Sequence, residues 1–219
     1  MSSVRYITTS KASPDETIIR PDDLDKLDEK LERIKKYFKS LESGLGIDVP
    51  EVEIDNFKKE LIRRLLILGF TIDYSSPRSF EVTREVDDKI IDGLKFSVTL
   101  MEEGDSILLY VFENLQIPHS KDVDKICNSV TELYHRFLKF VEGSKSIVRL
   151  FPDFEWYYNE RERSIIGYLG FGDGSGIFIR IAYPEYNEII VELCDEVKNL
   201  KELRELIDII KLVKELKEQ

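Results

Sequence analysis

Residues 170–176, Gly-Phe-Gly-Asp-Gly-Ser-Gly, come closest in this sequence to a phosphate-binding loop. Closely spaced glycines let backbone N–H groups surround an anion. No Lys-Ser or Lys-Thr pair follows, however, and the spacing never gives G-x-G-x-x-G at the start of a helix. The Asp-Gly pair lies between two apolar stretches, which is the strongest short signal for a β-hairpin. We therefore predict a hairpin here.

A metal-dependent nuclease core is the second chemistry that the residue types suggest. It needs a Pro-Asp pair and then an acidic residue two positions before a lysine, on adjacent strands. Pro21-Asp22 with residues 28–30 has these letters but falls in a predicted helix. Pro152-Asp153 falls among predicted strands, yet residues 160–163 contain no lysine. Because metal-dependent cleavage also needs clustered carboxylates, we expect no nuclease activity.

The histidines and cysteines offer no recognisable catalytic or metal-binding motif. Cys127 and Cys194 lie 67 positions apart, too far in sequence for a local zinc motif. His135 falls on the polar side of a predicted helix, and His119 follows a proline in a predicted loop. No serine or cysteine has a nucleophile context such as G-x-S-x-G. We therefore assign no catalytic residue, metal ligand or cofactor, although a triad assembled from sequence-distant residues would leave no such motif.

The composition describes a globular, acidic protein. It has 42% hydrophobic and 34% charged residues, with a formal net charge of -11. Nucleic acids and anionic membranes attract positive charge, so we expect direct binding to neither. The longest apolar run, residues 107–112, is far shorter than a membrane span, and the first residues lack the apolar stretch of a signal peptide. We expect a cytoplasmic protein.

Lys and Glu are abundant, whereas Gln occurs only at positions 116 and 219. Many charged residues with few thermolabile ones are typical of proteins from thermophiles. We therefore expect a thermophilic, archaeal source.

A narrow apolar stripe dominates the N-terminal part of the chain. Charged and polar residues fill the positions between its members, which predicts a helix over residues 22–43. A stripe this narrow suits contact with another helix, from a second copy or from the body of the same chain. We call this stripe the helix seam: Leu24, Leu27, Leu31, Ile34, Phe38 and Leu41.

Turn residues and periodicity predict the other elements. A second helix extends from Asp55 as N-cap to Gly69 as C-cap, and a third from Ser120 and Asp122 to Gly143. Period-two alternation and short apolar runs predict strands between and after these helices. The predicted strands cover residues 80–83, 94–100, 107–112, 147–151, 154–160, 164–171, 177–183 and 189–194, and a last helix begins at residue 199.

Aromatic residues are concentrated in the last predicted sheet. If Trp156 and Tyr158 point into the core, strand alternation places Tyr157 on the outer face. The same argument places Phe178, Arg180 and Ile190 there. The outer face of the first sheet is polar by contrast. An apolar outer face usually has a cover, which is either a partner or another part of the same chain.

These elements predict an α+β protein with antiparallel meander sheets backed by helices. Residues 1–20 are expected to be a flexible arm that could add an edge strand, and residues 21–45 an appended amphipathic helix. Two α+β units follow at 46–143 and 144–219, with 46–219 as one domain the alternative. The two halves are either a duplicated meander-plus-helix unit or two unrelated meanders that look alike.

We expect a non-enzymatic protein–protein interaction or assembly subunit that forms homodimers or binds another protein. Its expected interface combines the helix seam with the aromatic sheet face. The alternative is a small-molecule binding module or enzyme with an apolar pocket between the sheet and the C-terminal helix. The interface residues are Leu24, Leu27, Leu31, Ile34, Tyr157, Phe178, Arg180 and Ile190, and the alternative pocket is lined by Trp156, Tyr158 and Tyr168.

Overall fold

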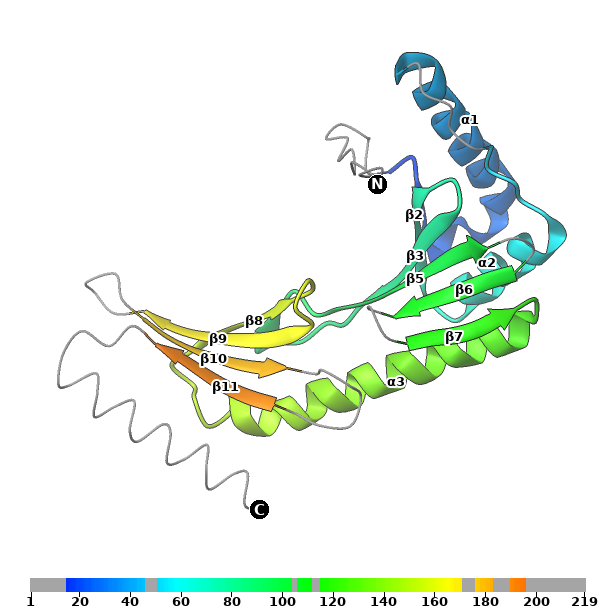
Figure 1. Ribbon diagram of the computed structural model, residues 1–219. Coiled ribbons are helices and arrows are strands. Elements are labelled where there is room, and N and C mark those ends of the chain that lie inside the picture. Colours follow the sequence, from blue (N-terminus) through cyan, green and yellow to red (C-terminus); the bar gives the residue numbers. More distant parts are fainter. Residues whose placement is uncertain are drawn as a thin grey trace, which may run out of the picture. The chain divides into compact units, whose positions relative to one another are not determined.

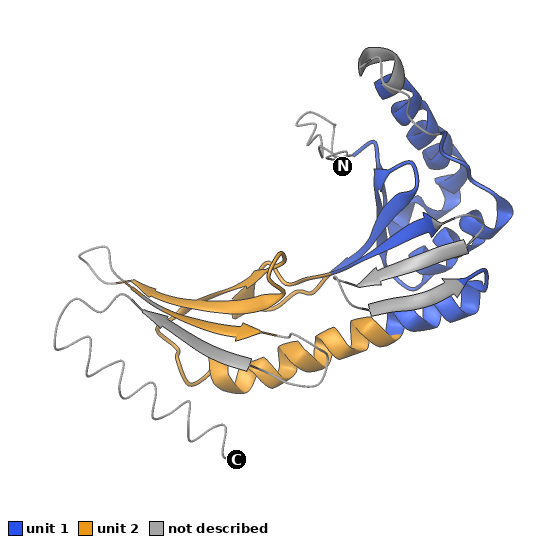
Figure 2. Cartoon of the chain, viewed as in Figure 1, with its two compact units in different colours: residues 1–84, 97–131 blue, residues 85–96, 132–219 orange. Residues whose placement is uncertain are grey.

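The computed structural model describes residues 15–45, 51–103, 106–111, 115–170, 176–182 and 190–195. These residues form an α+β fold with three α-helices and two mostly antiparallel sheets (Figure 1), which confirms the predicted class. The chain divides into two compact units, residues 1–84 with 97–131 and residues 85–96 with 132–219 (Figure 2). The expected boundary at residue 143 therefore falls inside the second unit.

The first unit contains a six-stranded sheet in the order β1-β2-β3-β5-β6-β7. Alternate side chains of its central strands are buried, as the period-two pattern predicts; examples are Ile72, Phe80 and Val98. The short strand β1 pairs with β2 at the sheet edge, so the expected edge strand of the N-terminal arm is present. The strands are β1 (Ile18–Ile19), β2 (Thr71–Ser76), β3 (Ser79–Glu85), β5 (Lys95–Glu103), β6 (Ser106–Val111) and β7 (Leu115–Ser120).

Two of these strands, β2 and β7, were not predicted from the sequence. In β2 the apolar alternation is limited to Ile72 and Tyr74, between polar neighbours. In β7 Pro118 interrupts the pattern, and a proline weakens a strand assignment. The sheet accommodates Pro118 because β7 is an edge strand, where a missing backbone N–H need not cost a ladder hydrogen bond.

The N-terminal helix of the first unit begins as the 3₁₀ turn η1 (Pro21–Lys26) and continues as α1 (Leu27–Leu45). Four members of the helix seam, Leu27, Leu31, Ile34 and Phe38, are buried within this single chain. Leu24 and Leu41 are half-buried. Asp28 of α1 forms an ion pair with Lys59 of α2 at 2.5 Å, so the start of α1 lies beside α2. The partner of the seam is therefore internal.

Helix α2 (Asn56–Ile67) begins and ends where the sequence predicts. Asp55 Oδ1 accepts a hydrogen bond from the backbone N–H of Lys58 at 2.7 Å, as an N-cap residue does. Gly69 follows the helix with φ of 83°, a left-handed conformation that favours glycine at a helix C-terminus. Arg84 Nη1 then donates to the Leu68 carbonyl at 3.0 Å, which satisfies one of the last free helix carbonyls.

Helix α3 (Val123–Val148) is longer than predicted. Asp122 Oδ1 accepts from the backbone N–H of Asp124 at 3.0 Å, which confirms the predicted start. The predicted end at Gly143 and the predicted strand 147–151 are wrong. Ile147 and Val148 continue the buried apolar stripe of the helix, and burial of this stripe outweighs the modest cost of one internal glycine.

The second unit contains a five-stranded sheet in the order β11-β10-β9-β8-β4. The short strand β4 comes from the loop between β3 and β5 and pairs in parallel with β8. Asp88, in the same loop, forms an ion pair with Lys145 of α3 at 2.8 Å. These strands are β4 (Ile91–Asp92), β8 (Glu155–Asn159), β9 (Ser164–Gly170), β10 (Gly176–Ala182) and β11 (Ile190–Asp195).

The core of the second unit lies between one face of this sheet and α3. Phe137 of α3 meets Tyr158 of β8 edge-on, with ring centroids 5.5 Å apart. Ile165, Ile179 and Ile181 are fully buried. Strands β9 and β10 pair in register from Gly170 and Gly176 onward, as expected for the predicted hairpin. Residues 1–14, 171–175 and the expected helix from residue 199 lie outside the described residues.

Because the helix seam is an internal core element, we predict that Leu31→Ala destabilises the protein. The expected loss is about 2–5 kcal/mol of unfolding free energy, the usual cost of truncating a buried leucine. Urea unfolding followed by circular dichroism measures it. Glu32→Ala, at an exposed position of the same helix, is the matched control and should change stability by less than ~0.5 kcal/mol. Equal stability of both variants would contradict an internal seam.

Candidate interaction surface

Strand register in the second unit sorts its aromatic residues onto two faces. Trp156 pairs with Gly167, and Tyr157 pairs with Ile166. Because neighbouring side chains along a strand point to opposite faces while paired residues share one, Tyr157 lies opposite to Trp156. The pairs Ile166–Arg180 and Tyr168–Phe178 extend the same assignment across β10. We call the set opposite the core the aromatic face: Tyr157, Ile166, Tyr168, Phe178 and Arg180.

Two large rings on the aromatic face are open to solvent. Tyr157 is 40% exposed and Phe178 is 41% exposed, although the opposite face of the same strands is buried. The Tyr168 and Phe178 rings lie 4.7 Å apart between centroids with an interplanar angle of 33°. Such cross-strand aromatic pairs stabilise a sheet and also fix the position of both rings. Glu155 pairs with Tyr168 and so lies on the same face, which therefore combines aromatic rings in fixed positions with charged side chains.

Glycines make room for the aromatic ring of Tyr168. A Cβ atom on Gly176 would lie 2.3 Å from Tyr168 Cε2, and one on Gly170 would lie 3.0 Å from the Tyr168 hydroxyl oxygen. The ring therefore lies against the paired backbones of these two glycines. On the core face, a Cβ on Gly167 would similarly lie 2.7 Å from the Trp156 ring. These three glycines thus provide space for aromatic side chains.

One ion pair borders the aromatic face. Arg180 Nε lies 3.2 Å from Glu162 Oε2, and the two side chains are 33% and 51% exposed. Glu162 belongs to the turn between β8 and β9, where its backbone N–H donates to Asn159 Oδ1 at 3.2 Å. A solvent-exposed pair of this kind contributes little to stability. Its main effect is to hold a guanidinium group beside the exposed rings.

The structure brings three of the expected interface residues together and separates others. Tyr157, Phe178 and Arg180 share the aromatic face, and the backbone of Ile190 in β11 pairs with Ala182 of β10. The side chain of Ile190 is outside the described set. Four helix-seam residues of the first unit, Leu27, Leu31, Ile34 and Phe38, are covered by their own chain, and Leu24 and Leu41 are half-buried. The seam therefore adds little open apolar surface.

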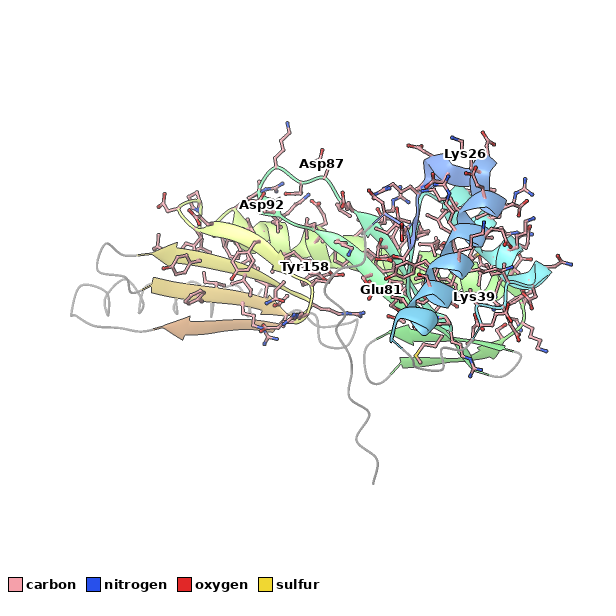
Figure 3. All side chains as sticks on the ribbon, turned by 90° about the horizontal axis from the view of Figure 1, so that it is seen from above. Lys26, Lys39, Glu81, Asp87, Asp92 and Tyr158 are labelled. Carbon is pink, nitrogen blue, oxygen red and sulfur yellow. The ribbon has the colours of Figure 1, made fainter. Side chains whose placement is uncertain are left out.

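The three residues expected to line a pocket do not share one face. Trp156 is buried and its Nε1–H donates to the Phe151 carbonyl at 3.2 Å. Tyr158, which Figure 3 labels, is two residues from Trp156 along β8 and contacts Phe137 of α3, so it lies on the same core face. Burial there raises the pKa of its hydroxyl to about 12. Tyr168 lies on the opposite face, paired with Phe178. The proposed C-terminal wall of that pocket falls outside the described residues.

The first unit contains a buried polar cluster that belongs neither to the expected interface nor to the alternative pocket. Lys58 Nζ lies 2.7 Å from Glu102 Oε1 and also donates to the Glu53 carbonyl. Tyr74 is buried nearby, and its hydroxyl has no hydrogen-bond partner among the described residues. Burial, and then the charge of Glu102, raise the pKa of Tyr74 above its ordinary value. A phenol that stays protonated near neutral pH is a poor general base, so we assign this cluster a structural role.

The described part of the chain also contains no metal-binding cluster and no activated cysteine. It contains no group of three or more His, Cys, Asp or Glu side chains placed to hold a metal ion. Cys127 is a free thiol, and burial raises its pKa to about 11, which disfavours the reactive thiolate. Among the described helices, none combines the length and the apolar character needed to cross a membrane.

We predict that Tyr74→Phe increases stability by about 1 kcal/mol at neutral pH, because it removes a buried hydroxyl that has no partner among the described residues. The tyrosine titrates near its usual pKa of about 10 only after unfolding. Wild-type stability is therefore fully present below pH ~10 and falls as the pH rises towards the higher folded-state pKa. The advantage of the variant should widen above pH ~10.

Urea unfolding at neutral and alkaline pH measures both effects. Tyr157→Phe, at an exposed ring, is the control and should show neither effect. A loss of stability at neutral pH in Tyr74→Phe would mean that the hydroxyl has a favourable partner.

No family model matches this sequence, and no curated protein and no solved structure is significantly similar to it.

Proposed function

We propose that this protein is a non-enzymatic interaction or assembly module and that the aromatic face is its protein-binding surface. The observation that carries the proposal is the pair of exposed rings, Tyr157 and Phe178, on a sheet whose other face is the core. Tyrosine and arginine are enriched at the centres of protein interfaces, where a few residues provide most of the binding free energy. Both residue types are present here.

The charge around this face favours a protein partner over a nucleic acid. Residues 155–195, from the start of β8 to the end of β11, contain eight acidic and three basic side chains. A nucleic-acid surface needs a clear positive excess, because phosphate contacts dominate that affinity. The basic residues in this range are Arg161, Arg163 and Arg180.

Rigidity of the surface also supports a binding role. Tyr168 is held between Phe178 and the two glycine backbones, and Arg180 is held by Glu162. Ordering of mobile side chains is one of the main costs of association, about 0.5–1.5 kcal/mol for each one immobilised. A preorganised aromatic face avoids much of that cost.

We predict that combining Tyr157→Ala with Phe178→Ala leaves the protein folded and abolishes its protein contacts. Loss of the ring contact between Phe178 and Tyr168 lowers stability, but both truncated side chains are partly exposed and the fold should persist. Truncating an interface hot spot costs ~2 kcal/mol or more of binding free energy. The measurement compares wild type and variant as tagged baits in the native cell, after cross-linking and identification of the linked peptides. Circular dichroism verifies folding.

Ile90→Ala, at a residue of the same unit that is 46% exposed and lies outside the aromatic face, is the matched control. The proposal requires cross-links near β8 to β10 in the wild type and in the control, and their loss in the double variant. Retention of all cross-linked proteins by the double variant would exclude the aromatic face as the binding surface.

We also propose a thermophilic source on the basis of the charged, Gln-poor composition. The purified protein should stay folded above the ~45–65 °C midpoints usual for mesophile domains. Thermal unfolding followed by circular dichroism at neutral pH measures this. A midpoint inside the mesophile range would remove the argument.

A further inference from the structure

We infer that strand β11 binds an extended segment of a partner protein as an additional strand of the sheet, and that this segment carries lysine or arginine at alternate positions. The inference goes beyond the proposed function, because it concerns the edge of the five-stranded sheet and not its aromatic face. When a strand is added to a sheet in this way, backbone hydrogen bonds provide affinity and alternate side chains provide specificity.

The backbone of β11 forms an open edge of the described sheet. The strand order is β11-β10-β9-β8-β4, so β11 is a terminal strand, as Figure 1 shows. Its six residues, Ile190–Asp195, pair with β10 without a register shift. In an antiparallel pair, every second residue directs its N–H and C=O groups away from the partner strand. About three residues of β11 therefore present both groups along this edge.

The three other edges of the two described sheets carry features that hinder strand addition. Strands β1 and β4 are each two residues long. Strand β7 contains Pro118, and its pairing with β6 has a register irregularity. Short edge strands, prolines and bulges are the usual means by which proteins protect a sheet edge. Strand β11 contains no proline, glycine or lysine, and it is regular over its whole length.

The charge of the edge segment selects the partner. Residues 188–196 contain four acidic residues and no basic one: Glu188, Glu192, Asp195 and Glu196. Like charges directly opposite each other destabilise a strand pair, whereas opposite charges stabilise it. The acidic residues therefore disfavour pairing of β11 with a second copy of itself. A strand with lysine or arginine at alternate positions has the complementary charge, which favours its binding over that of an acidic strand.

The test uses the full chain and three capped eight-residue peptides. The first peptide alternates lysine with threonine, and the second has glutamate in place of each lysine. The third is the lysine peptide with N-methyl groups on its central four backbone nitrogens, which removes donors from both edges of the strand and leaves the charge unchanged. The lysine peptide should bind at least ~10-fold more tightly than either of the others. Fluorescence anisotropy of the labelled peptides measures the affinities.

Amide hydrogen exchange and two charge reversals locate the bound peptide. Saturation with the lysine peptide should slow exchange of the amides in residues 190–195 that are not bonded to β10. Glu192→Lys should weaken binding of this peptide at least ~10-fold. Glu155→Lys, at an exposed position of β8, is the matched control and should weaken it less than ~3-fold, because β9 and β10 separate β8 from β11. Circular dichroism checks folding.

The comparison of peptides on the wild-type chain needs no variant, so it stands even if Glu192→Lys unfolds the protein. Equal affinity for the lysine peptide and its N-methylated form would overturn the inference, because charge alone would then explain binding. A lysine peptide that fails to bind at ~1 mM would also overturn it. So would slow exchange of every amide in residues 190–195 of the free protein, because the chain itself or a second copy would then cover the edge.

The proposed function fails on a different result. It requires that the double variant with Tyr157→Ala and Phe178→Ala lose its cross-linked proteins, whatever the peptides do at β11.

Discussion

The register of β8, β9 and β10 is the constraint on which the account of the second unit depends. A shift by one residue exchanges the two faces of a strand completely. In the observed register Trp156 packs over Gly167 on the core side, and Tyr168 packs against Gly170 and Gly176 on the other. A shifted strand would place a side chain where each ring now lies. The pairing of each aromatic ring with a glycine therefore favours this register over a shifted one.

This constraint explains why an apolar surface persists on the open side of the sheet. The core face takes the aliphatic residues Ile165, Ile179 and Ile181, which are fully buried. The residues that alternate with these isoleucines along β10 point to the opposite face. Phe178 and Arg180 are two of them. A sheet with one solvated face would normally place polar residues there. The departure from that pattern is why we assign the face a function.

The first unit shows the opposite situation, because its apolar pattern has a partner within the chain. Leu27, Leu31 and Ile34 are buried, and Asp28 is held by Lys59 of the neighbouring helix. A pattern that resembles an intermolecular seam is here a core element. Periodicity alone cannot distinguish these outcomes, because both require the same apolar stripe at helical spacing.

Sequence reasoning predicted the elements whose local signals agree with their tertiary environment. The caps at Asp55, Gly69 and Asp122 and the alternation in β5 and β10 were all visible in the residues. It missed β7, where Pro118 is accommodated only because the strand is at an edge. It also ended α3 at Gly143, where tertiary burial of Ile147 and Val148 overrides the local signal.

The candidate surface was predictable in part. Strand parity correctly separated Tyr157 from Trp156 and placed Phe178 with Arg180. The same parity could have separated Tyr168 from Trp156, but only once the pairing of β8 with β9 is known. The glycines at 170 and 176 suggested anion chemistry from their spacing alone. Their contacts with Tyr168 become visible only when the strands are paired.

Hydroxyl-radical footprinting of the aromatic side chains, in the purified protein and in an extract of the native cell, tests the central claim most directly. It reports the solvent exposure of each ring in the intact protein. If the aromatic face binds a protein partner, oxidation of Tyr157 and Phe178 is lower in the extract than in the purified protein. Oxidation of Ile90 and Leu150, exposed residues of the same unit outside that face, stays constant. Equal oxidation of both rings in the two samples would contradict the assignment of this face as a binding surface.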